Sequence, residues 1–79
     1  MRRFYLHVFN DASVLDTEGS ELPDLEAAAR DAVQGIRELI AEEVVAGRPI
    51  SRQHRIDIED EEGAHLHTVF FGDVLRLRD

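Results

Sequence analysis

Apolar and polar positions alternate near both ends of the chain and follow a helical spacing in its middle. From Phe4 to Phe9 the side chains alternate between two faces and are rich in aromatic and β-branched types, as is typical of a strand. Turn-forming residues at 10–13 precede a short apolar run at 14–16. Two further segments of this kind cover 52–59 and 65–71. The pattern therefore predicts four strands.

The middle of the chain predicts one long helix, from Pro23 to Ala46. Proline is favourable in a first turn, and Asp24 places negative charge at the positive end of the helix dipole. Gly47 is the expected end, with Pro49 just beyond it, because glycine readily adopts the left-handed conformation that closes a helix. Apolar residues recur every three or four positions and form one stripe: Leu25, Ala28, Ala29, Ala32, Val33, Ile36, Leu39, Ile40 and Val44.

Four strands and one helix predict a single α+β domain over residues 1–79, with the element order ββαββ. Two hairpins form one antiparallel four-stranded sheet, and the helix packs on one face of it. The pattern leaves open the order of the strands in the sheet. It also leaves open the segment 73–79, where a short helical turn over 74–78 and a continued strand both fit the residues.

A single helix covers only one face of a sheet, so the other face needs a separate explanation. Tyr5, Phe9, Val69 and Phe71 are the large apolar side chains expected there. A contiguous apolar patch on a soluble domain usually marks an interface, which predicts a homodimer through this face or through a sheet edge. Alternatively, loops or the C-terminal segment fold over the patch. Both faces of 65–71 carry large apolar groups, which predicts a bulge or burial on both sides.

Composition narrows the classes of function. The chain has 79 residues and no cysteine, which excludes disulfides, thiolate catalysis, iron–sulfur clusters and cysteine-based zinc sites. No apolar run reaches the roughly 20 residues of a membrane span. The apolar stretch that begins at Phe4 stops at Asn10 without the small-residue cleavage site of a signal peptide. These features predict a cytoplasmic protein without a membrane partner.

Nine arginines against seventeen acidic residues give a net charge of −8, which disfavours binding to nucleic acid. The acids concentrate in 11–31 and 57–63, around a basic segment that holds Arg48, Arg52 and Arg55. These arginines either bind a phosphate or an acidic partner, or neutralise acids of the same fold. We favour the second interpretation, because surface charges of both signs usually intermingle.

Three histidines form the candidate metal site. His65 and His67 lie two apart on a predicted strand, and His7 joins them if the first and fourth strands are neighbours. Imidazoles at this spacing bind zinc, nickel or copper, with Asp57 or Glu59 as a further ligand. The alternative is that all three are ordinary surface or half-buried histidines.

Other chemistry leaves no recognisable signature. The acidic turn Asp60–Glu62 lacks the alternating ligands of a calcium loop, and no serine lies in a nucleophile motif. A phosphate-binding glycine loop is also absent. We therefore expect no catalytic residues, no cofactor and no enzymatic activity.

The run D-x-E-G-x-E-L-P-D-L-E-A-A at 16–28, with the strands on either side of it, resembles a family of short bacterial proteins defined only as a domain of unknown function. That resemblance implies a small α+β fold and no assigned activity. The segments Phe4–Val8 and Leu22–Ala28 also have a looser similarity of shape to HicB-type antitoxins. The glycine-rich turn and aromatic strand of those antitoxins are missing.

Three hypotheses of function follow. The first is a small interaction module that self-associates, and it is the one we favour. The second is a regulatory protein that binds a small ligand or a metal through His7, His65 and His67. The third is an antitoxin-like inhibitor of a basic partner.

Overall fold

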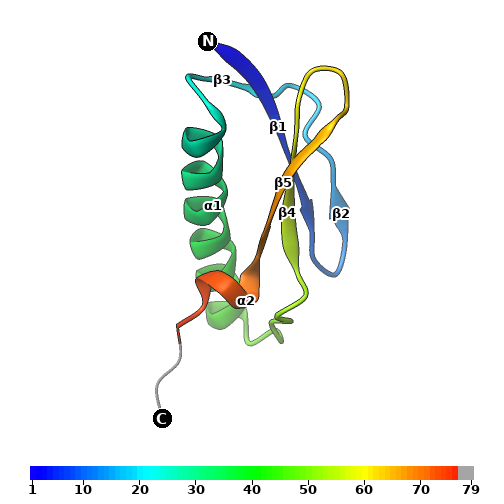
Figure 1. The fold of residues 1–79 in the computed structure, drawn as a ribbon. Helices are drawn as coiled ribbons and strands as arrows, with labels where there is room; N and C mark the ends of the chain where they lie inside the picture. Colours follow the sequence, from blue (N-terminus) through cyan, green and yellow to red (C-terminus); the bar gives the residue numbers. More distant parts are fainter. Residues whose placement is uncertain (77–79) are drawn as a thin grey trace.

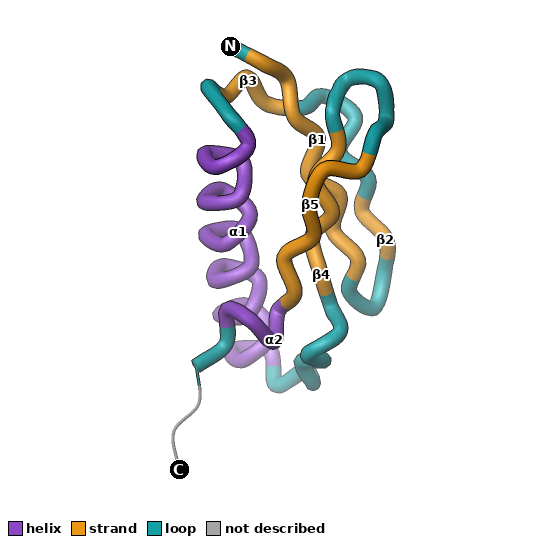
Figure 2. Tube along the Cα trace, viewed as in Figure 1, coloured by secondary structure: helices purple, strands orange, loops and turns teal. Residues whose placement is uncertain are grey.

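The computed structural model describes residues 1–76, which form an antiparallel sheet with one long helix along one of its faces (Figures 1 and 2). The elements are β1 (Arg2–Phe9), β2 (Ser13–Val14), β3 (Ser20–Leu22), α1 (Leu25–Ala46), β4 (Arg55–Glu59), β5 (His65–Phe70) and α2 (Phe71–Val74). The predicted α+β class is confirmed. The described sheet has five strands rather than four, so the predicted order ββαββ is incomplete.

The additional strand is β3, which lies in a stretch interpreted as a polar loop. It pairs antiparallel with the start of β1, Phe4 opposite Ser20. Gly19 turns the chain into this position with a φ of 72°. A Cβ on Gly19 would lie 2.9 Å from Cγ of Arg3 and 3.0 Å from the Phe4 carbonyl oxygen, so only glycine fits without a shift. Three residues are too few to show an alternating pattern, which is why the sequence alone did not predict this strand.

β1 is long enough to hold the sheet together. Its start pairs with β3, its end pairs with β2, and its other side pairs with β4, giving the order β2-β1-β4-β5. At the centre, Leu6 lies opposite Ile58. β2 is shorter than the predicted strand over 14–16, and Leu15 beyond it is exposed.

α1 begins and ends at residues with clear capping geometry. Asp24 is extended, and its carboxylate accepts a hydrogen bond from the Ala27 N–H at 2.8 Å, so the helix begins at Leu25 rather than at the predicted Pro23. Its end at Ala46 is as predicted. Gly47 adopts φ 72°, and its N–H bonds back to the last turn.

The core lies between α1 and the helix-facing side of the sheet. It consists of Phe4, Ala28, Ala32, Ile36, Ile56, Ile58, Val69 and Phe71. Small residues bring the helix close to β4, since a Cβ on Gly35 would lie 3.7 Å from Cδ1 of Ile56. The predicted stripe is buried at its centre, but Val44 in the last turns is 65% exposed.

A bulge sets the phase of β5, as the apolar groups on both of its faces suggested. Glu59 lies opposite His65, whereas Ile58 lies opposite His67, so Leu66 is an extra residue on the β5 side. One extra residue moves every following side chain to the other face of the sheet.

Because of this shift, the prediction is wrong for two of the four residues expected at the interface. Val69 lies opposite Ile56 and is 8% exposed, and Phe71 is 1% exposed at the start of α2. Both belong to the core, and Phe70 takes the position on the outer face instead. α2 turns the chain at once after β5, where the Phe71 N–H donates to the His54 carbonyl at 2.7 Å. Of the two alternatives left open for 73–79, the structure has neither as stated: the helical turn is at Phe71–Val74, residues 75–76 belong to no helix or strand, and positions 77–79 lie outside the described residues.

Candidate functional site

β5 forms one edge of the sheet. Among residues 1–76 it pairs only with β4. The bond from the Phe71 N–H to His54 fixes the alternation of the ladder, because antiparallel neighbours exchange hydrogen bonds at every second pair. The backbone groups of His67 and Val69 therefore face β4. Those of Thr68 and Phe70 point out of the sheet, where another strand would bind.

The composition of this edge differs from that of most natural edge strands. Exposed edges are usually protected by charged side chains or proline, which oppose the addition of a further strand. β5 reads His-Leu-His-Thr-Val-Phe and contains no Asp, Glu, Lys, Arg or Pro. In a chain with a net charge of −8, an uncharged strand of six residues at an edge is a surface suited to β-pairing.

The opposite edge is closed by a loop that Asp16 anchors. One carboxylate oxygen of Asp16 accepts hydrogen bonds from the N–H groups of Glu18 and Gly19 at 3.1 and 2.9 Å, and the other accepts from Leu6 at 3.2 Å. Partial burial by itself raises the pKa of Asp16, but the donors on Gly19, Leu6 and Glu18, with nearby His7, outweigh burial and lower that pKa below its ordinary value. The loop is therefore tied to β1 by an ionised carboxylate.

His7 completes this anchor. Its Nδ1 accepts the Asp16 N–H at 3.0 Å, which leaves Nε2 to donate to Oε1 of Glu59 at 3.2 Å. The ring is well covered, with a side-chain exposure of 12%. Both ring nitrogens of this predicted metal ligand thus have partners inside the fold.

A second polar cluster occupies the outer face near β5. Oδ1 of Asp57 accepts hydrogen bonds from the Thr68 hydroxyl at 2.9 Å and from Nε of Arg55 at 3.2 Å. The Arg55 guanidinium also lies 4.4 Å from the centre of the Phe9 ring. His65 approaches the Thr68 hydroxyl at 2.7 Å. The face that was predicted to be an apolar patch is instead largely hydrogen-bonded, with Phe9 half-buried beneath a cation.

The structure separates the three predicted metal ligands. β1 borders β4 rather than β5, so His7 and His65 are not on neighbouring strands. The expectation that His65 and His67 share a face is wrong, because the bulge places His67 opposite the core residue Ile58. Within the described chain, no three His, Cys, Asp or Glu side chains gather in a way that would hold a metal ion.

The basic segment is mostly neutralised within the fold. Arg48 forms a two-pronged contact with Glu43 at 2.7 and 3.0 Å. This hydrogen bond lowers the pKa of Glu43 and raises the pKa of Arg48. Arg55 pairs with Asp57, as described above. Two of the three arginines therefore have acidic partners in the same chain, as the favoured interpretation expected.

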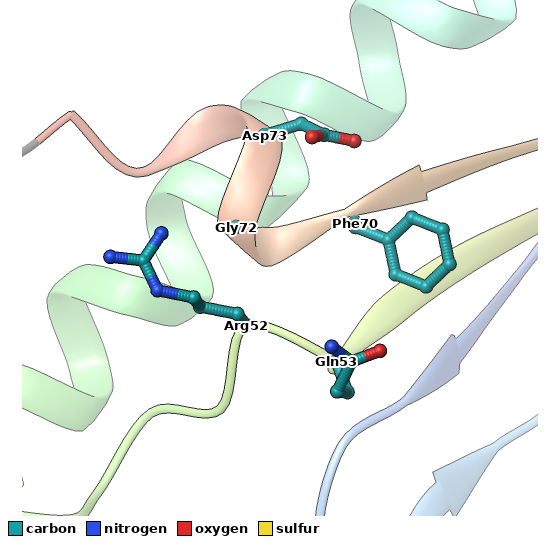
Figure 3. A pocket seen from close by; sticks show the side chains of 5 residues that line it. All are labelled: Arg52, Gln53, Phe70, Gly72 and Asp73. Carbon is teal, nitrogen blue, oxygen red and sulfur yellow. The ribbon is translucent and has the colours of Figure 1, made fainter.

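The third arginine, Arg52, lines a hollow of about 330 Å³ beside the end of β5. Figure 3 shows the Arg52 side chain and the Phe70 ring pointing in opposite directions, with Asp73 on a third side. Ligand sites bring several polar groups together on one point. In this hollow the labelled side chains diverge instead.

A groove of about 520 Å³ runs along α1. Ala29 and Val33 form its apolar floor, and longer side chains form the rest of its lining: Glu26, Arg30, Gln34 and Arg37. Of these six residues, only Ala29 and Val33 belong to the predicted apolar stripe, so the sequence did not predict the groove. A signal was present, since Ala29 and Val33 lie at the margin of the apolar stripe.

Comparison with known proteins assigns the chain to a family. Residues 3–72, which run from β1 into α2, match the family model described as Domain of unknown function (DUF6894). The chain belongs to DUF6894. Nothing among curated proteins or solved structures matches this DUF6894 chain. In its described residues, neither helix has the length and apolar character needed to cross a membrane.

Proposed function

We propose that this domain is a small interaction module that self-associates by pairing β5 with β5 of a second copy. The observation that carries the proposal is the edge of β5, which has no Asp, Glu, Lys or Arg and which no strand other than β4 pairs with among residues 1–76. The module needs no catalytic centre for this role, in keeping with the divergent side chains around Arg52.

Geometry restricts how two copies pair. Most soluble homodimers have a two-fold axis, which makes the two strands antiparallel and matches each residue with its symmetry-related partner. Only residues whose backbone groups point outward can exchange hydrogen bonds, and Thr68 and Phe70 are of that kind. Pairing centred on Thr68 meets this requirement. It places Thr68 opposite itself, and His67 opposite Val69 of the second copy.

Charge supports the same surface. Each copy carries a net charge of −8, so two copies repel each other over most of their surfaces. β5 adds no carboxylate, ammonium or guanidinium group to the contact. An axis at Thr68 also keeps the acidic β4–β5 turn out of the centre of the interface.

The test is sedimentation velocity over a concentration series. We expect the wild-type domain to reach twice the 9.0 kDa mass of one chain. Thr68→Pro removes an N–H that points away from β4, a position where edge strands tolerate proline, and we expect a monomer with an unchanged circular dichroism spectrum. Thr68→Val keeps the N–H and is the matched control, which stays dimeric.

Amide hydrogen exchange on the wild-type protein provides a test without any variant. The Thr68 and Phe70 amides should gain protection as the concentration rises, whereas the Val69 amide, already bonded to β4, should change little. A wild-type monomer at millimolar concentration would contradict the proposal. So would exchange at Thr68 that is independent of concentration.

A further inference from the structure

We infer that the groove on α1 faces its own copy in the β5-paired dimer, so that Glu26 of each chain forms an ion pair with Arg37 of the other. This inference rests on the proposed function, since it takes the two-fold axis at β5 as given. The ion pairs add an electrostatic contact to the pairing of the strands, and they explain why both signs of charge line the groove.

The groove lies on the side of α1 that faces β5. β3 and β4 both run antiparallel to β1, so they are parallel to each other, and α1 connects them across one face of the sheet. Such crossovers are right-handed in nearly all proteins. The α-helix is right-handed, and a right-handed crossover carries the chain from β3 toward β4 and β5. A helix residue that directly follows a buried residue in the sequence therefore points toward the β4 and β5 side. Ala29 follows Ala28 and Val33 follows Ala32, so the groove floor faces the side of α1 on which β5 lies. In Figure 1, β5 is the strand in front of β4.

The middle of the groove and Thr68 lie at about the same height along the sheet. Gly35 lies level with Ile56, and Ile56 pairs with Val69. The middle of the groove lies between positions 31 and 32. At 1.5 Å per residue, this is about 5 Å from Gly35 toward the start of the helix. About 5 Å back along β5 is roughly 1.5 residues, which leads from Val69 to the neighbourhood of Thr68. One two-fold axis therefore passes close to both midpoints.

The lining of the groove is self-complementary under a two-fold axis. A two-fold axis makes the two copies of α1 antiparallel. The lining residues are symmetric about the groove midpoint, so that position 26 faces 37, position 29 faces 34 and position 30 faces 33. The symmetry thus places Glu26 of each chain opposite Arg37 of the other, so the dimer contains two such pairs. Each Arg30, which holds Glu26 of its own chain at 3.7 Å, faces the apolar Val33 of the other copy.

The distance between the helices decides which side chains meet. With each α1 above its own β4, three strand spacings separate the two axes, about 14 Å. Helices in direct contact are about 8–10 Å apart, so Ala29 and Val33 do not touch across the axis. The long side chains of Glu26 and Arg37 together span this distance. The contact is therefore electrostatic, and it is weakened by salt.

A charge-swap cycle tests the pair through the dimer dissociation constant. We expect Arg37→Glu and Glu26→Arg each to raise that constant roughly fivefold, because two exposed ion pairs are replaced by two like-charge contacts. The double variant E26R/R37E restores the opposite charges and should return to within about twofold of wild type. Glu38→Arg makes the same charge change as Glu26→Arg on another face of α1 and is the matched control.

Salt provides a second measurement. At 1 M NaCl, where screening acts over about 3 Å, the differences between these variants should disappear. The inference is overturned if the swap fails to restore binding, or if Glu38→Arg weakens the dimer as much as Glu26→Arg. If Thr68→Pro abolishes the dimer but the charge-swap variants leave its dissociation constant unchanged, the pairing of β5 is supported and the contact between the helices is overturned. If the wild-type protein is a monomer, both the pairing of β5 and the contact between the helices are overturned.

Discussion

The two edges of the sheet are built in opposite ways. At one edge β1 carries two very short strands, β2 and β3, and Asp16 ties the connecting loop to the backbone of Leu6. At the other edge β5 presents six residues with no pairing partner beyond β4 among residues 1–76. One edge is satisfied by the chain's own loop, and the other has hydrogen-bonding groups left for a second strand. The difference is the basis of the proposal that the β5 edge is the one through which two copies associate.

The largest expected effect comes from removing the anchor of the closed edge. Asp16→Ala leaves three backbone N–H groups without their carboxylate partner, and we expect it to lower the free energy of unfolding by about 3 kcal/mol. Urea denaturation at pH 7 measures this. The matched variant on the free edge, Thr68→Val, should cost less than about 1 kcal/mol. Equal costs at the two edges would remove the contrast between them.

A smaller effect is expected at the turn into β3. Gly19 and Gly47 both have φ 72°, but only Gly19 is crowded by Arg3 and Phe4. Gly47→Ala should cost about 1 kcal/mol for its backbone conformation alone, and Gly19→Ala about 2 kcal/mol because a clash is added. Thermal unfolding of the two variants separates these contributions. A larger loss for Gly47→Ala would contradict the close packing of the loop on β1.

The smallest expected effect is a pH dependence of the closed edge. Because the pKa of Asp16 is lowered in the folded state, its contribution to stability is present above the unfolded value near 3.8 and is lost as the pH falls through the lower folded value. The carboxyl is partly solvated, so we expect less than about 1 kcal/mol. Urea denaturation of wild type and Asp16→Asn at pH 6 and pH 3 should show the two proteins converging at the lower pH. If the difference in the free energy of unfolding between the two proteins were larger at pH 3 than at pH 6, the prediction would be wrong.

The elements with local determinants were predictable from the sequence. The end of α1 follows from Gly47, and the helix start was placed within two residues because Asp24 and Pro23 mark it. The buried centre of the helix follows from the spacing of Ala28, Ala32 and Ile36. Each of these depends on residues within one or two turns of the helix.

Features that depend on distant partners were not predictable in detail. The strand pattern of 65–71 indicated a bulge but not its position, and the position decides that Val69 and Phe71 are buried. β3 depends on its contact with β1, and the role of His7 depends on Asp16 and Glu59. The acidic residue three positions before Gly19 was a usable signal for the anchored loop, because Asp side chains commonly bond to N–H groups two or three residues on.

The pairing of β1 with β4 has a consequence for how quickly the domain folds. β1–β2 and β4–β5 join segments that are close in the chain, and such hairpins form within microseconds. By contrast, the central pairing brings Tyr5 to Glu59 and Phe9 to Arg55, across most of the sequence. Closing so long a loop must precede any gain from those contacts, and non-local pairing of this kind slows folding. The folding rate of the domain is therefore set by the meeting of its two halves rather than by the formation of either one.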